Sequence, residues 1–277
     1  MSQSATIYQL AARRLGFGGL ALITAAALVG MWYTPHNPLH LDIAHRLLPP
    51  SGNYWFGTDQ FGRDVFSRVL TGAAVSLRVS LATVTFATVI GVLLGAVAGY
   101  FRGWVDRVIG VFLDAFLALP GILLALVLIA LVGTGEVGVV LALGVAYAPS
   151  IARVVRASVL SIREQPYVEA ARLFGHPHWY IVSRHIVPNI VGPLTVLVTN
   201  YYAQALLAES LLSFLGLGVP PPYPSWGGIL AEGQAYLSDA PWLSMFPGLA
   251  IVFSLLCVNL AGDALRDRFD PRGMAGR

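Results

Sequence analysis

Long apolar runs alternate with short polar segments along this chain. An α-helix needs about 20 mainly apolar residues to cross the hydrocarbon core of a bilayer. The pattern predicts six transmembrane helices, at residues 15–33, 81–100, 108–132, 137–152, 191–215 and 243–265. Pro120 and Gly121 interrupt the third run. The first run is longer than the roughly 7–15 residues of a signal-peptide core, and further runs follow, so it is interpreted as an uncleaved membrane helix.

Composition narrows the class of protein. Hydrophobic residues make up 56% of the 277 residues and charged residues only 11%, with a mean hydropathy of +0.71. A soluble domain carries roughly 25% charged residues. We therefore expect an all-α, polytopic integral membrane protein with six transmembrane helices.

A ridge of small residues marks the second run. Gly91, Gly95 and Gly99 recur at four-residue spacing. In a membrane such a ridge lets the backbone of a neighbouring helix approach closely. This run is therefore expected to pack tightly against another span.

The first long polar segment covers residues 34–78 and opens with prolines, which stop helices. Arg63, Asp64 and Arg68 follow at spacings that place them near one face of a helix. The sequence predicts a short amphipathic helix here, leading into the second span.

The arginines predict the orientation. Six spans place both termini on one side of the membrane. If the N-terminus is inside, 13 of the 17 arginines fall in inner segments; the other four are Arg46, Arg63, Arg68 and Arg78. Basic residues favour the cytoplasmic side. Both termini and the loop at 166–188 are therefore expected in the cytoplasm, and the proline-rich loop at 216–242 outside.

The loop from Pro166 to Pro188 contains a helix signal. Pro166 suits the first turn of a helix, and Gly175 can adopt the left-handed conformation that ends one. A helix of about two turns is too short to be stable alone in water. It must pack on something, either the membrane surface or a partner protein.

No energy-coupling motif occurs in the chain itself. All 17 basic residues are arginine, and the phosphate-binding motif G-x-x-x-x-G-K-[ST] requires a lysine. The single cysteine, Cys257, lies in an apolar run and cannot form an internal disulfide. No constellation of nucleophile, base and acid looks catalytic, so no enzyme activity is expected.

The 166–188 loop resembles the signature loop of ATP-binding-cassette (ABC) importer permeases, E-A-A, three residues, G, nine residues and I-x-L-P. The corresponding residues of this chain are Glu169-Ala170-Ala171, Gly175 and His185-Ile186-Val187-Pro188. Two residues depart mildly from the motif: His185 replaces the usual Ile, and Val187 replaces the usual Leu. The resemblance implies that this helix, which includes Arg172, sits in a groove of a cytoplasmic ATPase. It also implies that closure of the ATPases moves the spans.

Further stretches are similar to the C-type subunit of dipeptide/oligopeptide/nickel permeases, at residues 57–72, 214–218, 225–227 and 259–271. The resemblance implies the fold of ABC type I importer permeases. It divides the chain into a cytoplasmic segment (1–14), a first helix with an outer loop (15–80), the permease domain (81–265, with a coupling loop at 158–190) and a cytoplasmic tail (266–277).

The same resemblance implies a function. The chain is expected to be the permease subunit of an ATP-driven importer of di- or oligopeptides, working by alternating access; nickel or a nickel chelate is the alternative cargo. Expected partners are a second, homologous permease, two ATPases that bind ATP and Mg²⁺, an extracytoplasmic solute-binding protein and membrane lipid. No nucleic acid and no cofactor of its own are expected.

Two carboxylates, Asp114 and Glu209, fall within apolar spans without an evident basic partner there. Such residues are functional candidates. They are expected to line a translocation path, to relay protons in an ion-coupled carrier, or to form inter-helix hydrogen bonds or salt bridges. A carrier of that kind would need no ATPase.

Three histidines, His36, His40 and His45, precede the 57–72 stretch. Imidazoles suit nickel or zinc, but the proline-flanked segment does not fix their geometry, and a structural role is favoured. His176 and His178 fall in the 166–188 loop, where polar surface residues are expected.

Overall fold

The computed structural model describes residues 3–269 of the chain, and the surroundings of side chains from residue 13 to residue 267. These residues are mainly helical and form no strand. The α-helices are α1 (Gln3–Trp32), α2 (Val65–Phe101), α3 (Gly103–Leu117), α4 (Gly121–Val132), α5 (Glu136–Arg163), α6 (Pro166–Leu173), α7 (His178–Ile181), α8 (Val187–Phe214), α9 (Trp226–Gly233) and α10 (Trp242–Phe269). Two 3-10 turns, η1 (Ile43–His45) and η3 (Gln234–Tyr236), and one π-helical turn, η2 (Val182–Ile186), accompany them.

The helices confirm the predicted all-α membrane fold. Within the described residues five helical stretches are long and apolar enough to cross a membrane, and α3 with α4 makes a sixth if the pair counts as one span. This third span departs from the expectation, because α3 and α4 meet at 93°. Pro120 lacks the N–H that would continue the helix and disfavours helical backbone at Leu119, which accounts for the break.

The amphipathic helix predicted to lead into the second span forms the first turns of α2, although Arg63 and Asp64 precede the helix. Helix α2 runs without interruption for 37 residues. At 1.5 Å per residue it is about 55 Å long, well beyond the roughly 30 Å of a hydrocarbon core. Asp64 caps its N-terminus by accepting a hydrogen bond from the Ser67 backbone N–H at 3.0 Å.

Several other helices are also longer than expected. Helix α5 continues to Arg163, so Arg153 and Arg156 are helix residues and not loop residues. Arg78 likewise lies inside α2. The 216–242 loop holds α9, and α10 continues into the first residues of the expected tail. Residues 270–277 of that tail lie outside the described part of the chain.

The glycine ridge of α2 packs as predicted. A Cβ atom built on Gly95 would lie 2.4 Å from the Ala152 carbonyl oxygen of α5, and one on Gly91 would lie 2.7 Å from the Ile151 Cβ. At Gly99 the nearest atom, the Arg156 carbonyl oxygen, is 2.9 Å away. Only glycine permits this backbone approach, so the ridge fixes how α2 and α5 cross.

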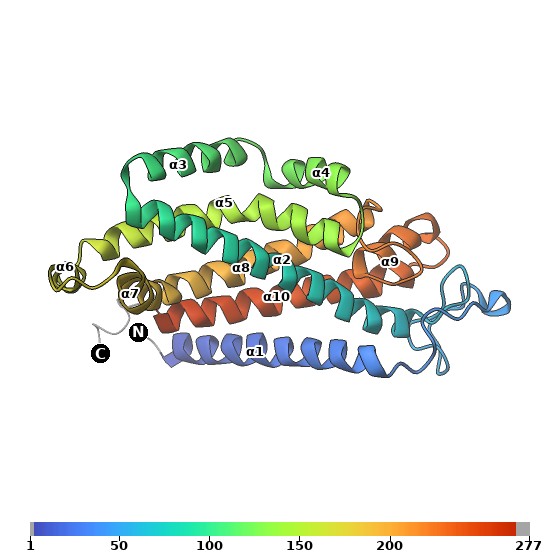
Figure 1. Cartoon of the computed structure of the whole chain (residues 1–277). Coiled ribbons are helices and arrows are strands. Elements are labelled where there is room, and N and C mark those ends of the chain that lie inside the picture. Colours follow the sequence, from blue (N-terminus) through green and yellow to red (C-terminus); the bar gives the residue numbers. More distant parts are fainter. Residues whose placement is uncertain (1–2, 270–277) are drawn as a thin grey trace.

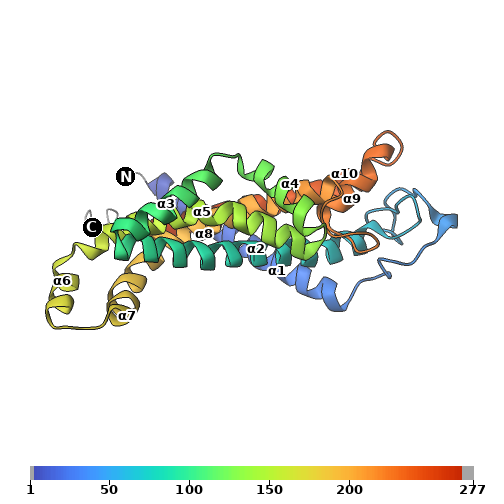
Figure 2. The same ribbon diagram turned by 45° about the horizontal axis from the view of Figure 1, so that its top comes forward.

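The long helices lie alongside one another, and the connecting segments gather at the two ends of the bundle (Figure 1). One end carries α6 and α7 together with the start of α1 and the last turns of α10. The opposite end carries α9 and the 33–64 segment. In Figure 2, α6 and α7 project beyond the end of the long helices.

Candidate functional site

Helix α6 has the boundaries that the sequence predicts. Pro166 occupies its first turn. At the other end Gly175 has a φ of +74°, the Gly175 N–H donates to the Arg172 carbonyl at 2.9 Å, and the His176 N–H donates to the Ala171 carbonyl at 3.2 Å. These two bonds form the Schellman motif, which satisfies the carbonyl groups at a helix end. The left-handed Gly175 is thereby confirmed.

One face of α6 is anchored in the protein. Val168 and Ala171 are buried, and they belong to an apolar cluster that also contains Val159 of α5, Ile181 of α7 and Ile186 of η2. An isolated helix of eight residues is unstable in water. Helix α6 therefore depends on its packing against α5, α7 and η2.

The other face of α6 is exposed. Glu169 and Ala170 are exposed, and so is Pro188 in the first turn of α8. Leu173 and Phe174 at the tip of the loop are 82% and 83% exposed, and the nearby Trp179 is 71% exposed. Clustered large apolar side chains at a surface mark an interaction site. The exposed tip is suited to a complementary apolar groove.

Sequence reasoning missed Tyr100, which ties the coupling loop to the bundle. Its hydroxyl lies 2.7 Å from Nδ1 of His178 in α7. Its carbonyl accepts a hydrogen bond from Arg163 at the end of α5 at 2.6 Å, and the Arg172 guanidinium of α6 lies 5.6 Å from its ring centroid. One residue of α2 thus contacts three elements around the loop. In the sequence, the one indication that Tyr100 makes such contacts is its position directly after Gly99 of the glycine ridge.

Asp114 has a basic partner, contrary to expectation. The Arg153 Nη2 of α5 donates to its Oδ1 at 2.6 Å, although the two side chains are 58% (Arg153) and 72% (Asp114) exposed. A second pair joins the same two helices, because Arg156 of α5 binds Asp106 of α3 through two nitrogen atoms. This second pair is less exposed, at 35% for Arg156 and 18% for Asp106.

Glu209 occupies a different environment. It is 1% exposed, and its Oε1 accepts a hydrogen bond from the Ser213 hydroxyl at 2.8 Å. The Ser210 hydroxyl lies 3.4 Å from its Oε2. Both serines lie on α8 with Glu209, so these hydrogen bonds satisfy the buried carboxylate within its own helix. A role for Glu209 in a translocation path stays a prediction.

Comparison with known proteins identifies the family. Residues 91–273 match the family of binding-protein-dependent transport system inner membrane components. The chain is 45% identical over 259 residues to a protein of Brucella suis biovar 1 (strain 1330) whose name describes a peptide transport system permease, covering 94% of this chain and 87% of that one. This chain belongs to that permease family. It is also 38% identical to the dipeptide transport system permease protein of Alkalihalophilus pseudofirmus (strain ATCC BAA-2126 / JCM 17055 / OF4), covering 95% and 88% of the two chains.

Solved structures share the fold of this permease. A methionine ABC transporter in an inward-facing conformation superposes with a TM-score of 0.60 at 20% identity, over 73% of this chain and 96% of that chain. The predicted ABC importer permease fold is thereby confirmed. The family and the apolar helices together show a multi-pass inner-membrane protein.

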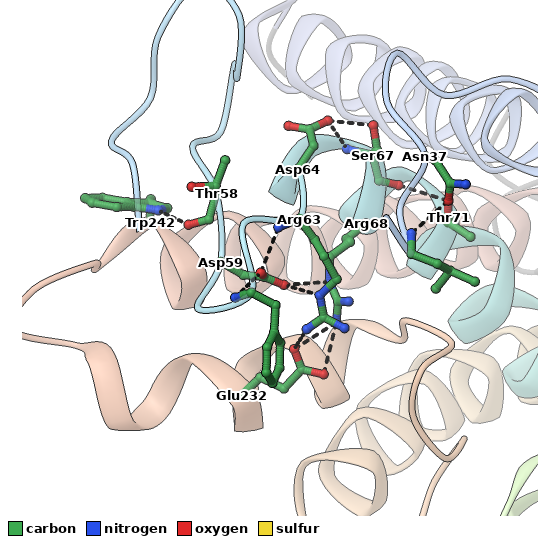
Figure 3. A network of polar contacts seen from close by, with 12 residues as sticks. Asn37, Thr58, Asp59, Arg63, Asp64, Ser67, Arg68, Thr71, Glu232 and Trp242 are labelled. Atoms are coloured by element: carbon green, nitrogen blue, oxygen red, sulfur yellow. Dashed lines mark hydrogen bonds and ion pairs between the residues drawn. The ribbon is translucent and has the colours of Figure 1, made fainter. Parts of the chain in front are cut away.

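A buried ionic network holds the opposite end of the permease together (Figure 3). Asp59 accepts from the Arg63 Nε at 2.6 Å, and Glu232 of α9 accepts from Arg63 at 2.7 Å and from Arg68 at 2.9 Å. The two arginines are 5% and 2% exposed by side chain, Asp59 is 3% exposed, and Glu232 is 26% exposed. The network joins the 57–68 segment to α9. The predicted loops at this end therefore form one folded unit.

Two of the three histidines at this end, His36 and His45, lie beside carboxylates. The His45 Nδ1 lies 2.7 Å from Oδ2 of Asp42, and this hydrogen bond lowers the pKa of the Asp42 carboxyl. The His36 Nδ1 lies 3.4 Å from Oδ2 of Asp64. Across the residues that the structure describes, no three His, Cys, Asp or Glu side chains form a group that would hold a metal ion.

Proposed function

We propose that this permease is the C-type subunit of an ATP-driven importer of di- and oligopeptides that works by alternating access. The names of its relatives support peptides as the cargo, because they describe peptide and dipeptide transport systems. The match covers most of each relative's length. A second, homologous permease would complete the path.

The end of the bundle that carries α6 is assigned to the cytoplasm. The excess of arginine in the predicted inner segments supports this orientation. Both terminal helices reach the same end as α6 (Figure 1), as an even number of spans requires. The ionic network and α9 then lie outside, where a solute-binding protein would deliver its peptide.

Helix α6 is the proposed contact with an ATPase, and one observation carries this assignment. The helix is anchored on one face by Val168 and Ala171, while Leu173 and Phe174 are largely exposed. Two ATPase subunits, which would bind ATP and Mg²⁺, would each receive such a tip. Their closure would pull α6 and pass the displacement through Tyr100 to α2 and α5.

The test is the Phe174→Ser substitution in the assembled importer. Burying one large apolar side chain contributes about 1.5–3 kcal/mol, so the affinity for the ATPase is expected to fall roughly 10- to 100-fold. Peptide uptake should fall in parallel. The side chain is exposed in this chain, so the fold of the permease should be unchanged.

Tyr223→Ser provides the matched control, since Tyr223 is an aromatic residue, 63% exposed, at the opposite end of the bundle. ATPase binding should be normal in this variant. Wild-type ATPase binding and uptake in the Phe174→Ser importer would refute the assignment of α6.

A further inference from the structure

A pair of opposite charges lies on an open face of the membrane-spanning helices. Asp114 is the twelfth residue of α3, about 16 Å along the helix from its start, and Arg153 faces it from α5. Both side chains are mostly exposed within this chain. Charged side chains in a membrane face a water-filled cavity or protein and not lipid. Lipid therefore does not cover this face.

The backbone at the same face leads to the same conclusion. The 93° break between α3 and α4 leaves residues 118–120 exposed. The Ala118 N–H still donates to the Asp114 carbonyl and the Pro120 carbonyl accepts from the Leu124 N–H, so within the described residues only the Leu119 backbone takes part in neither helix's hydrogen bonds. Non-helical backbone at membrane depth is tolerated only where it is buried in protein or lines a water-filled cavity. The break begins four residues after Asp114.

Polar side chains continue this face onto α8. Tyr147 of α5 lies beside Gly121, at the start of α4, and its ring centroid is 5.3 Å from that of Tyr201 of α8. One helical turn further along α8, the exposed Gln204 donates to the exposed Asn200 at 2.7 Å. Polar groups thus follow α3, α5 and α8 across an otherwise apolar set of spans.

We propose that this face lines the peptide path and that Asp114 and Arg153 bind the two charged ends of a zwitterionic peptide. The Asp114 carboxylate would receive the peptide ammonium group, and the Arg153 guanidinium would receive the peptide carboxylate with two parallel hydrogen bonds. Without peptide the two residues neutralise each other, and both are accessible enough to exchange partners. This proposal rests on the proposed function as a peptide importer.

The chain contains a matched control for this proposal. Asp106 and Arg156 join the same two helices with the same chemistry, but they are more deeply covered and thus suited to bracing α3 against α5. A bracing role and a peptide-binding role therefore make different predictions for the two pairs.

The first experiment measures water access in the complete importer, with both permeases, both ATPases and the binding protein. Asp114→Cys and Asp106→Cys are each labelled with a charged, membrane-impermeant thiol reagent; native Cys257 is buried and gives a low background. Cysteine at 114 is expected to react at least tenfold faster and to be protected by dialanine during turnover. Absence of labelling at 114 would mean that the second permease covers the face, and this would overturn the proposal.

The second experiment measures dialanine uptake per ATP hydrolysed in proteoliposomes. Asp114→Asn and Arg153→Gln should each lower this ratio at least tenfold, while Asp106→Asn should stay within about threefold of wild type. Equal losses for all three variants, or none for the first two, would overturn the proposal. Failure of the wild-type importer to take up any peptide would instead refute the proposed function.

Discussion

Substitution of Gly175 tests how strongly the backbone conformation at this position controls the proposed contact of α6 with an ATPase. The Gly175 φ of +74° places this residue in the left-handed region, and a Cβ built on it would meet nothing within 4 Å. A larger residue therefore has room, and its cost is conformational and not steric. Left-handed backbone costs a typical L-residue roughly 1–2 kcal/mol. Asparagine tolerates it best, and β-branched residues tolerate it least.

The free-energy cost of Gly175→Val can be worked out for two responses of the turn. If Gly175→Val keeps the left-handed turn, the cost is about 1–2 kcal/mol. If the turn opens instead, the hydrogen bonds donated by the N–H groups of residue 175 and His176 are lost, at a net cost of about 1 kcal/mol each. Both responses give a similar value, which corresponds to roughly a 5- to 30-fold fall in the population of correctly shaped α6.

The assay is titration of purified ATPase onto the reconstituted permease pair carrying Gly175→Val or Gly175→Asn. The valine variant should bind 5- to 30-fold more weakly, while the asparagine variant should remain within about threefold of wild type. Thermal unfolding of the permeases without ATPase should be unchanged, because α6 lies at the end of the bundle (Figure 2). Equal binding by the valine and asparagine variants would refute the conformational argument.

Two further predictions concern stability, each measured as thermal unfolding of the purified permease in detergent. Gly95→Ala should cost about 1–3 kcal/mol through overpacking, because the new Cβ would lie 2.4 Å from the Ala152 carbonyl oxygen. Gly110→Ala, with nothing within 4 Å of the new Cβ, should be neutral or stabilise α3 by up to about 1 kcal/mol. Glu232→Gln leaves the buried guanidinium groups of Arg63 and Arg68 without one of their carboxylate partners, so it should lower the free energy of unfolding by an amount near the lower end of about 3–5 kcal/mol. Arg78→Gln breaks an exposed ion pair and should lower it by less than about 1 kcal/mol. Equal effects of Gly95→Ala and Gly110→Ala would contradict the packing argument. Equal effects of Glu232→Gln and Arg78→Gln would contradict the burial argument.

Features that depend on near neighbours in the chain were predictable. The apolar runs fix where helices cross the membrane, and Gly175 fixes where α6 ends, because both are governed by the residue itself and its immediate surroundings. The glycine ridge also belongs here, since its three residues share one face of a single helix. The sequence additionally located the interruption of the third span at Pro120.

Features that depend on contacts between distant segments were not predictable. The 93° angle at the interruption depends on how α3 and α4 pack, and periodicity carries no information on that. The apolar run that predicts the fourth span ends at residue 152, so sequence reasoning places Arg153 in a loop and leaves Asp114, 39 residues away, without a basic partner. Helix α5 in fact extends past Arg153, since its buried face packs against the glycine ridge of α2 as far as Val159.

By itself the sequence determined the class of protein, the number of apolar runs and the helix whose tip is proposed to meet an ATPase. Only the tertiary structure decided which polar groups face one another: Arg63 and Arg68 around Glu232, Tyr100 beneath α6, and Asp114 beside Arg153. The physical reason is the separation along the chain over which each kind of interaction acts. Hydrophobicity and backbone preference act within a few residues, whereas an ion pair or a hydrogen bond requires two atoms about 3 Å apart, and folding brings such atoms together from any separation along the chain.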